Sequence, residues 1–134
     1  MAATTGAAIK AHIETLGLGV PVFREKPPKD TAYPFVTVQD ELSLTLQRLA
    51  DAAQELAQVD LWQLLRHPAG HALQGRVAED AELVRRLQRG LRRFPLLGAP
   101  TLTYQGVLEG SVRLPEPDSN LVHHALTVRV HREL

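Results

Sequence analysis

Histidines are the residues of this sequence best suited to bind a metal or to transfer protons. His67 and His71 are four residues apart, the spacing that brings two zinc ligands onto one face of a helix. Pro68 and Gly70 stand between them, and both residues oppose the continuous helix that this geometry needs. We therefore expect this segment to be a loop after a strand, without a metal site.

Near the C-terminus, His123, Arg129 and His131 share one face of a segment that alternates like a strand. Such a row of imidazoles and cations is ordinary on an exposed face, so we interpret these residues as exposed and not as ligands. Asp40 interrupts an apolar face, but no second carboxylate or base accompanies it for acid–base catalysis. The chain has no cysteine, which excludes disulfides and thiolate chemistry. The sequence thus predicts no catalytic residue, no metal and no cofactor.

The most concentrated charge in the sequence is basic. Five arginines fall within nine residues: Arg85, Arg86, Arg89, Arg92 and Arg93. We interpret them first as the solvated face of a helix, in which Glu82 and Arg86 have the spacing of an i,i+4 ion pair. The alternative is a positive patch for the carboxylates of a partner or for passing DNA. The first four of these arginines are therefore candidate interface residues.

Length and composition predict one soluble globular domain over residues 1–134. Its 44% hydrophobic and 22% charged residues are close to average globular usage. Fifteen basic and fifteen acidic residues give zero net charge, which removes the global argument for a nucleic-acid or anionic-membrane partner. Zero net charge also favours association between copies of the chain. With no long apolar run and no signal-peptide pattern, we expect an intracellular site of synthesis.

The N-terminal part predicts a helix followed by a short strand. Residues 2–16 repeat apolar side chains at helical spacing, and His12 beside this stripe is expected to be packed or at its boundary. Residues 20–23 predict a brief strand, which Pro21 confines to a sheet edge or a strand start.

Residues 24–34 combine three prolines with five charged residues and lack periodicity, which predicts an exposed loop. A loop that only connects two elements is the plainer interpretation, while contact with a partner is the alternative. The candidate contacts in this loop are Lys26, Lys29 and Asp30.

Two long strands are predicted in the middle of the chain. Residues 35–44 alternate with period two, as do residues 56–65, which we expect to be the central strand. Residues 45–54 have helical composition but are few, and we interpret them as a connection that includes at most a turn of helix. The central strand has one apolar face and one mixed face with Asp60 and Trp62. That mixed face is covered either within the subunit or by a neighbouring subunit, which makes both residues candidate interface residues.

The C-terminal half predicts a long helix and two further strands. Residues 76–93 carry an apolar stripe at helical spacing. Residues 101–114 are strand-like with a bulge at Gly110, and residues 121–132 alternate throughout. Because the strands follow one another with helices set apart, the sequence predicts an α+β domain. We expect a mixed, mostly antiparallel sheet of four to five strands with two helices packed on one face.

The order of these segments resembles a known family. The resemblance rests on YPFVTVQ after a proline-rich loop, on VDLW before a loop and a long helix, and on the last strand, HHALTVRVHRE. In this arrangement the chain is similar to the tail terminator, or tail completion, proteins of long-tailed, siphovirus-like bacteriophages, including the lambda tail terminator. The similarity covers nearly the whole chain, but none of its motifs is a chemical signature.

The resemblance implies a structural virion protein of the tail neck, assembled in the host cytoplasm. Such a protein forms a homo-oligomeric ring, a hexamer, on the head-proximal end of the tail tube and stops tube polymerisation. Its partners are the tail tube protein and the head connector or head-completion protein, and double-stranded DNA passes through its lumen without sequence-specific binding. The family implies no enzymatic activity, no cofactor and no membrane contact.

Several other functions compete with this one. Another neck protein, either a head-closure protein or an adaptor, fits the same features. A tube subunit usually needs a long hairpin for stacking, and none is evident in the sequence. A small α+β enzyme or ligand-binding domain would need converging titratable groups, which the spacing does not show. A nucleic-acid-binding module would need an excess of basic residues.

Overall fold

The computed structural model describes residues 5–49, 52–64, 74–95, 104–116 and 121–133. Neither of its two described helices is long and apolar enough to cross a membrane. The elements in chain order are α1 (Thr5–Glu14), β1 (Val22–Arg24), β2 (Phe35–Leu49), β3 (Ala52–Leu64), α2 (Gln74–Leu91), β4 (Arg93–Pro95), β5 (Tyr104–Leu114) and β6 (Leu121–Glu133).

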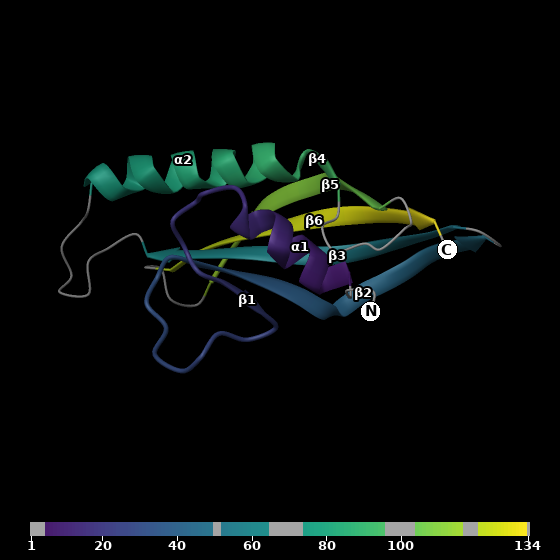
Figure 1. The fold of residues 1–134 in the computed structure, drawn as a ribbon. Helices are drawn as coiled ribbons and strands as arrows, with labels where there is room; N and C mark the ends of the chain where they lie inside the picture. Colours follow the sequence, from purple (N-terminus) through teal and green to yellow (C-terminus); the bar gives the residue numbers. More distant parts are fainter. Residues whose placement is uncertain (1–4, 50–51, 65–73, 96–103, 117–120, 134) are drawn as a thin grey trace.

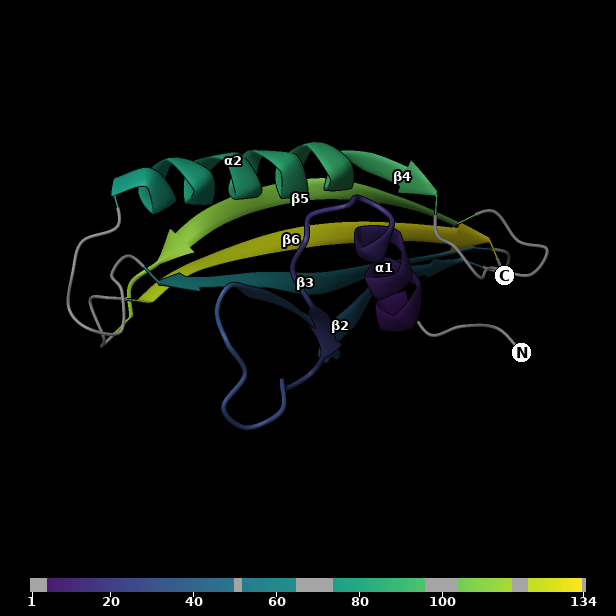
Figure 2. The ribbon, with the colours of Figure 1, turned by 60° about the vertical axis from the view of Figure 1, so that its left-hand side comes forward.

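The strands form one six-stranded sheet in the order β1-β2-β3-β6-β5-β4. β1 runs parallel to β2, and every other neighbouring pair is antiparallel. Both helices cover the same face of the sheet (Figures 1 and 2). The predicted α+β fold is thus confirmed, with β3 in the interior of the sheet. The strand count exceeds the prediction by one because a three-residue strand, β4, adds one edge, while the predicted brief strand, β1, forms the other.

The hydrophobic core lies between the helices and the face of the sheet that they cover. Alternate residues of β2 and β3, such as Val38 and Leu61, are fully buried there, as are Ile9 of α1 and Leu87 and Leu91 of α2. Period two in the strands and period 3.6 in the helices place these side chains on one interface. The apolar stripes that the sequence shows are therefore the two sides of a single core.

α1 and the residues after it pack directly against the backbone of α2 at Gly90, which has no side chain. The Nε2 atom of His12 on α1 lies 2.8 Å from the carbonyl oxygen of Gly90 on α2, and its ring stacks on Phe94 with 4.3 Å between centroids. Leu16 packs so closely on Gly90 that a Cβ there would lie 2.7 Å from its Cδ2. The expectation that His12 is a packed residue is confirmed.

The prediction that residues 45–54 form a connection with at most a turn of helix was wrong. β2 continues to Leu49 and β3 begins at Ala52, so these residues belong to a long antiparallel hairpin. β6 runs beside this end of β3, pairing Ala52 with Glu133, and the three strands extend past both helices (Figure 1). Backbone pairing on both sides of β3 overrides the helical preference of a segment rich in Ala, Leu and Gln.

The predicted bulge near Gly110 is confirmed. Leu108 pairs with Val128 but Gly110 pairs with Thr127, so β5 carries one extra residue at this point. The extra residue reverses which β5 side chains face the helices. Leu108 packs against the core, whereas Val112, beyond the bulge, lies beside Ala125 and is 55% exposed.

His124 makes the stability of the fold depend on pH. Its half-buried ring lies on β6 in register with Arg113 of β5. Burial lowers the pKa of His124 from its ordinary value of 6.5, and the positive charges of Arg113 and His123 lower it further. The unfolded chain therefore takes up this proton at a higher pH than the folded chain. The His124 contribution to stability is complete above pH 6.5 and should be lost as the pH falls below that value.

Thermal unfolding followed by circular dichroism at neutral and mildly acidic pH checks this expectation. His124→Gln should show a smaller acid-induced loss of Tm than the parent chain, because the substitution removes one of the protons that the unfolded state gains. His131→Gln is the control, since His131 is exposed on the same strand and should leave the acid loss unchanged. An equal acid loss in the parent and in His124→Gln would contradict the assignment.

Candidate functional site

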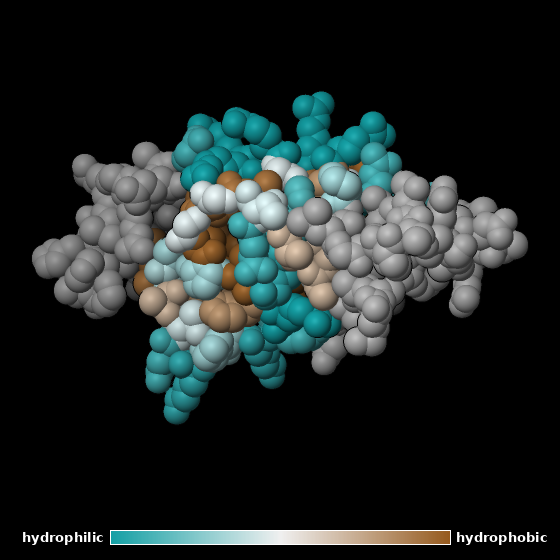
Figure 3. All heavy atoms as spheres, in the orientation of Figure 1, coloured by the Kyte–Doolittle hydropathy of each residue, from teal (hydrophilic) through white to brown (hydrophobic). Residues whose placement is uncertain are grey.

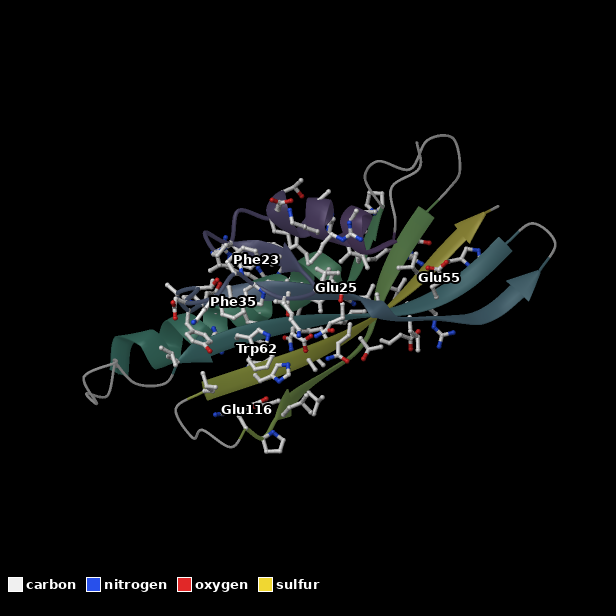
Figure 4. The ribbon with its side chains drawn as sticks, turned by 90° about the horizontal axis from the view of Figure 1, so that it is seen from below. Phe23, Glu25, Phe35, Glu55, Trp62 and Glu116 are labelled. Atoms are coloured by element: carbon white, nitrogen blue, oxygen red, sulfur yellow. The ribbon has the colours of Figure 1, made fainter. Side chains whose placement is uncertain are left out.

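The face of the sheet opposite the helices carries a row of rings that crosses four strands. Phe23 on β1, Phe35 on β2, Trp62 on β3 and His123 on β6 follow one another, as the labelled residues of Figure 4 show in part. The centroid distances along the row are 6.2 Å, 6.5 Å and 3.8 Å, and Trp62 and His123 are stacked. Tyr33 adds a fifth ring, 5.1 Å from Phe35. We call these five residues the aromatic row.

Asp60, two residues before Trp62 on β3, faces the same side of the sheet and is fully buried. Its Oδ1 atom accepts a hydrogen bond from Nε2 of Gln58 at 2.8 Å and lies 2.6 Å from Nε2 of His123. Its Oδ2 atom accepts a hydrogen bond from Nε2 of Gln39 at 3.1 Å. These bonds compensate for the loss of water around a buried carboxylate.

His123 lies between two carboxylates. Its Nε2 atom faces Asp60, and its Nδ1 atom lies 2.7 Å from Oε1 of Glu116. A neutral imidazole has one N–H group, whereas the doubly protonated ring donates to both carboxylates at once. Stacking of this ring on Trp62 places it over a face of the indole that attracts positive charge.

Asp60, His123, Glu116, Gln39 and Gln58 form one hydrogen-bonded network, which we call the polar support. His123 bridges two carboxylates, and Trp62 donates through Nε1 to the hydroxyl oxygen of Thr37 at 3.3 Å. Within the described residues, no three His, Cys, Asp or Glu side chains converge as metal ligands do.

A pocket of about 280 Å³ opens beside the aromatic row. Loop residues form one wall, and side chains of β2 and β3 form the other. Its lining residues are Glu25, Lys26, Pro27, Tyr33, Phe35, Thr37, Gln39 and Trp62. We call this hollow the aromatic pocket. The charged loop of residues 24–34 is thus one wall of a binding-sized hollow.

A second hollow, of about 480 Å³, lies on the helix side of the molecule. Its lining residues, on and just after α2 and on β5, are Arg85, Gln88, Arg89, Arg92 and Leu108. Figure 3 shows hydrophilic atoms, in teal, along this side of the molecule above α2. We call Arg85, Arg89 and Arg92 the arginine face. The structure therefore brings three of the four predicted arginines around one concave surface.

The fourth predicted arginine has another role. Nη2 of Arg86 donates to the carbonyl oxygen of Gly17 at 2.6 Å and so ties α2 to the segment after α1. The expected ion pair of Glu82 with Arg86 was therefore wrong, because Glu82 instead lies 3.7 Å from Nη1 of Arg85, at the i,i+3 spacing. Both members of that pair are exposed, so it adds little stability.

The remaining candidates divide between buried and exposed positions. Asp60 offers no surface of its own in the single chain, and Trp62 is partly exposed at the aromatic pocket. Lys26, Lys29 and Asp30 are all exposed, but only Lys26 lines that pocket. His67 and His71 lie outside the described residues.

The sequence prediction missed the role of His123. We expected an exposed residue, but His123 is 7% exposed because Trp62 stacks on it and two carboxylates flank it. Glu116 and Gln39 were also not singled out. The sequence shows that β3 and β6 both alternate with period two. This pattern places His123 beside Asp60 only once the two strands are known to be neighbours.

No protein-family model matches the sequence, and no curated protein sequence matches it either. Among solved structures, a chain of the structure entitled "Virion of native gene transfer agent (GTA) particle" shares the fold, with a TM-score of 0.58. The match covers 97% of this chain and 87% of that chain at 14% sequence identity. The likeness therefore concerns the fold, and it extends over nearly the whole sequence.

Proposed function

We propose that this chain is a structural virion protein of a tailed, phage-like particle, and specifically a tail terminator. The observation that carries the proposal is its fold, which matches a chain of a gene transfer agent virion over 97% of its length. In this role copies of the chain form a ring, a hexamer, on the head-proximal end of the tail tube. The ring stops tube growth, presents its other face to the head connector, and lets DNA pass through its lumen.

The surfaces of the chain support a ring. A ring needs two different patches, one on each side of the subunit, that fit each other across every contact. The aromatic pocket and the arginine face differ in chemistry and lie on opposite sides of the sheet.

A tube subunit is the second candidate, and one observation favours it. The long hairpin that such a subunit usually needs for stacking is present, since β2 has 15 residues and β3 has 13. The sequence argued against a tube subunit only because no long hairpin was evident in it, and the structure contains such a hairpin. A terminator and a tube subunit differ in one measurable property, because a terminator closes into rings whereas a tube subunit polymerises.

Light scattering coupled to size-exclusion chromatography and negative-stain imaging of the purified chain test the proposal. We expect closed rings that do not stack into tubes and that bind one end of preformed tails. Particles assembled without the chain should carry tails of uncontrolled length, because nothing stops tube growth. Filaments of the chain alone, or the absence of any tube without it, would identify a tube subunit. A monomer at every concentration and in the presence of tails would refute both assembly functions.

A further inference from the structure

The aromatic pocket has the composition of a site for a cationic side chain. Tyr33, Phe35 and Trp62 present ring surfaces to it, and ring faces attract guanidinium and ammonium groups. Glu25 contributes a carboxylate at the same hollow. Gln39 directs its amide nitrogen to Asp60, which leaves its carbonyl oxygen as the acceptor for other donors. Acceptors and ring faces together suit a planar group with several N–H donors.

Carboxylates lie in and near the pocket. Glu25 lines it, and Asp60 and Glu116 flank His123, which stacks on Trp62 of the pocket wall. Lys26 also lines the pocket, and its side chain is exposed to solvent. The carboxylate of Glu25 and the negative faces of the aromatic rings favour an arriving cation. Burial of Asp60 away from water strengthens its electrostatic effect on nearby groups.

The opposite side of the chain presents the complementary group. Three other cations of the described surface are already used: Lys10 bonds to Glu14 at 3.0 Å, Arg86 to Gly17, and Arg129 to Glu109. Among the residues that the structure describes, none accepts a hydrogen bond or an ion pair from the side chain of Arg89 or Arg92. Both line the hollow of the arginine face.

We propose that the aromatic pocket of one copy binds an arginine side chain, Arg89 or Arg92, from the arginine face of a second copy. The two surfaces lie on opposite faces of the sheet, so each copy donates on one side and accepts on the other. This is the head-to-tail contact from which rings and filaments are built. The contact rests on the proposed function, because it names the partner through which the assembly forms. It also explains why the polar support of Asp60 and His123 holds Trp62 in place at the wall of the pocket.

Two sets of variants separate the two sides of the contact. The pocket variant, Glu25→Gln with Tyr33→Leu, removes a carboxylate and a ring from the pocket wall formed by residues 24–34. Neither residue belongs to the hydrophobic core. The arginine variant, Arg89→Gln with Arg92→Gln, removes two exposed guanidinium groups. Each should weaken self-association at least about tenfold, the range expected for the central residues of an interface. Arg93→Gln is the matched control, because Arg93 is exposed close by but does not line the hollow, and it should associate like the parent.

Mixing the two variants tests the head-to-tail geometry directly. The pocket variant retains its arginines and the arginine variant retains its pocket, so an equal mixture can form one good contact per pair. Sedimentation velocity should then show heterodimers, while neither variant alone forms dimers or rings at the same concentration. Arg89→Lys with Arg92→Lys should recover only part of the association, because lysine keeps the charge but lacks the planar group that stacks on rings.

The single tryptophan provides an independent readout of the pocket. In the mixture, only Trp62 of the arginine variant lies in an intact pocket, so Trp62→Phe is introduced into the pocket variant to silence its own emission. A change in emission on mixing is expected, and none when the silenced copy also lacks Arg89 and Arg92. If rings form normally in both variants, this contact is wrong while the proposed function stands. If the parent chain never associates, the proposed function itself fails.

Discussion

Asp60→Ala is expected to lower the free energy of unfolding by about 3–5 kcal/mol, because three hydrogen-bond donors lose their acceptor at about 1–3 kcal/mol each and two of them are only partly buried. Asp60 is fully buried, and its carboxylate is bonded to His123, Gln39 and Gln58. Without it, two partly buried amide groups and one buried ring nitrogen lose their acceptor. Urea denaturation followed by circular dichroism measures the difference.

Graded controls identify the cause of this loss. Asp60→Asn keeps the size of the side chain and one acceptor oxygen, so its loss should be smaller than that of Asp60→Ala. Glu116→Gln should cost least, because Glu116 is 20% exposed and water can replace part of its bond to His123. A loss of less than about 1 kcal/mol for Asp60→Ala, within the range of an ordinary hydrogen bond, would show that the buried cluster adds no special stability.

Gly106→Ala is the second substitution for which we expect a large effect, a loss of about 1–3 kcal/mol from overpacking. Phe94 on β4 is 2% exposed and lies over Gly106, with which it pairs across the strands. A Cβ at this position would overlap the Phe94 ring, with Cε1 only 2.5 Å away. The ring is enclosed by the core and by His12, so it has little room to move.

Gly110→Ala provides the matched control on the same strand. A Cβ at Gly110 meets nothing within 4 Å, so the substitution should leave the unfolding midpoint nearly unchanged. Equal effects at the two glycines would mean that strand backbone freedom, and not contact with Phe94, sets the cost. The double variant Gly106→Ala with Phe94→Leu should recover part of the loss, because leucine occupies less space over the new methyl group.

The two faces of the sheet differ in chemistry, as a head-to-tail contact between copies requires. The helix side encloses the apolar core and presents the arginine face on its outer surface. The other side carries the polar support beside the aromatic row and opens the aromatic pocket next to it. Because the buried cluster fixes the position of Trp62, damage to Asp60 should weaken self-association as well as folding. Measuring both properties on Asp60→Asn would separate the two effects.

The amino-acid sequence by itself determined both helices, most of the strands and which side of these elements is apolar. Period two in residues 56–65 and 121–132 and the helical stripe in residues 76–93 depend on neighbours along the chain, so they can be read locally. The bulge at Gly110 and the edge position of β1 follow from single residues with special backbone properties in the same way. These features sufficed to predict the α+β fold with its helices on one face.

Only the tertiary structure decided which side chains meet across strands. His123 and Asp60 are 63 residues apart in sequence, and their contact follows from the pairing of β3 with β6. The hairpin through residues 45–54 likewise exists because strands on both sides of β3 satisfy its backbone, which no local propensity reveals. The candidate site consists largely of such cross-strand contacts. The sequence therefore pointed to Asp60, Trp62 and the arginines, while the contact of Asp60 with His123 and the pocket beside Trp62 emerged only when the strands were placed in register.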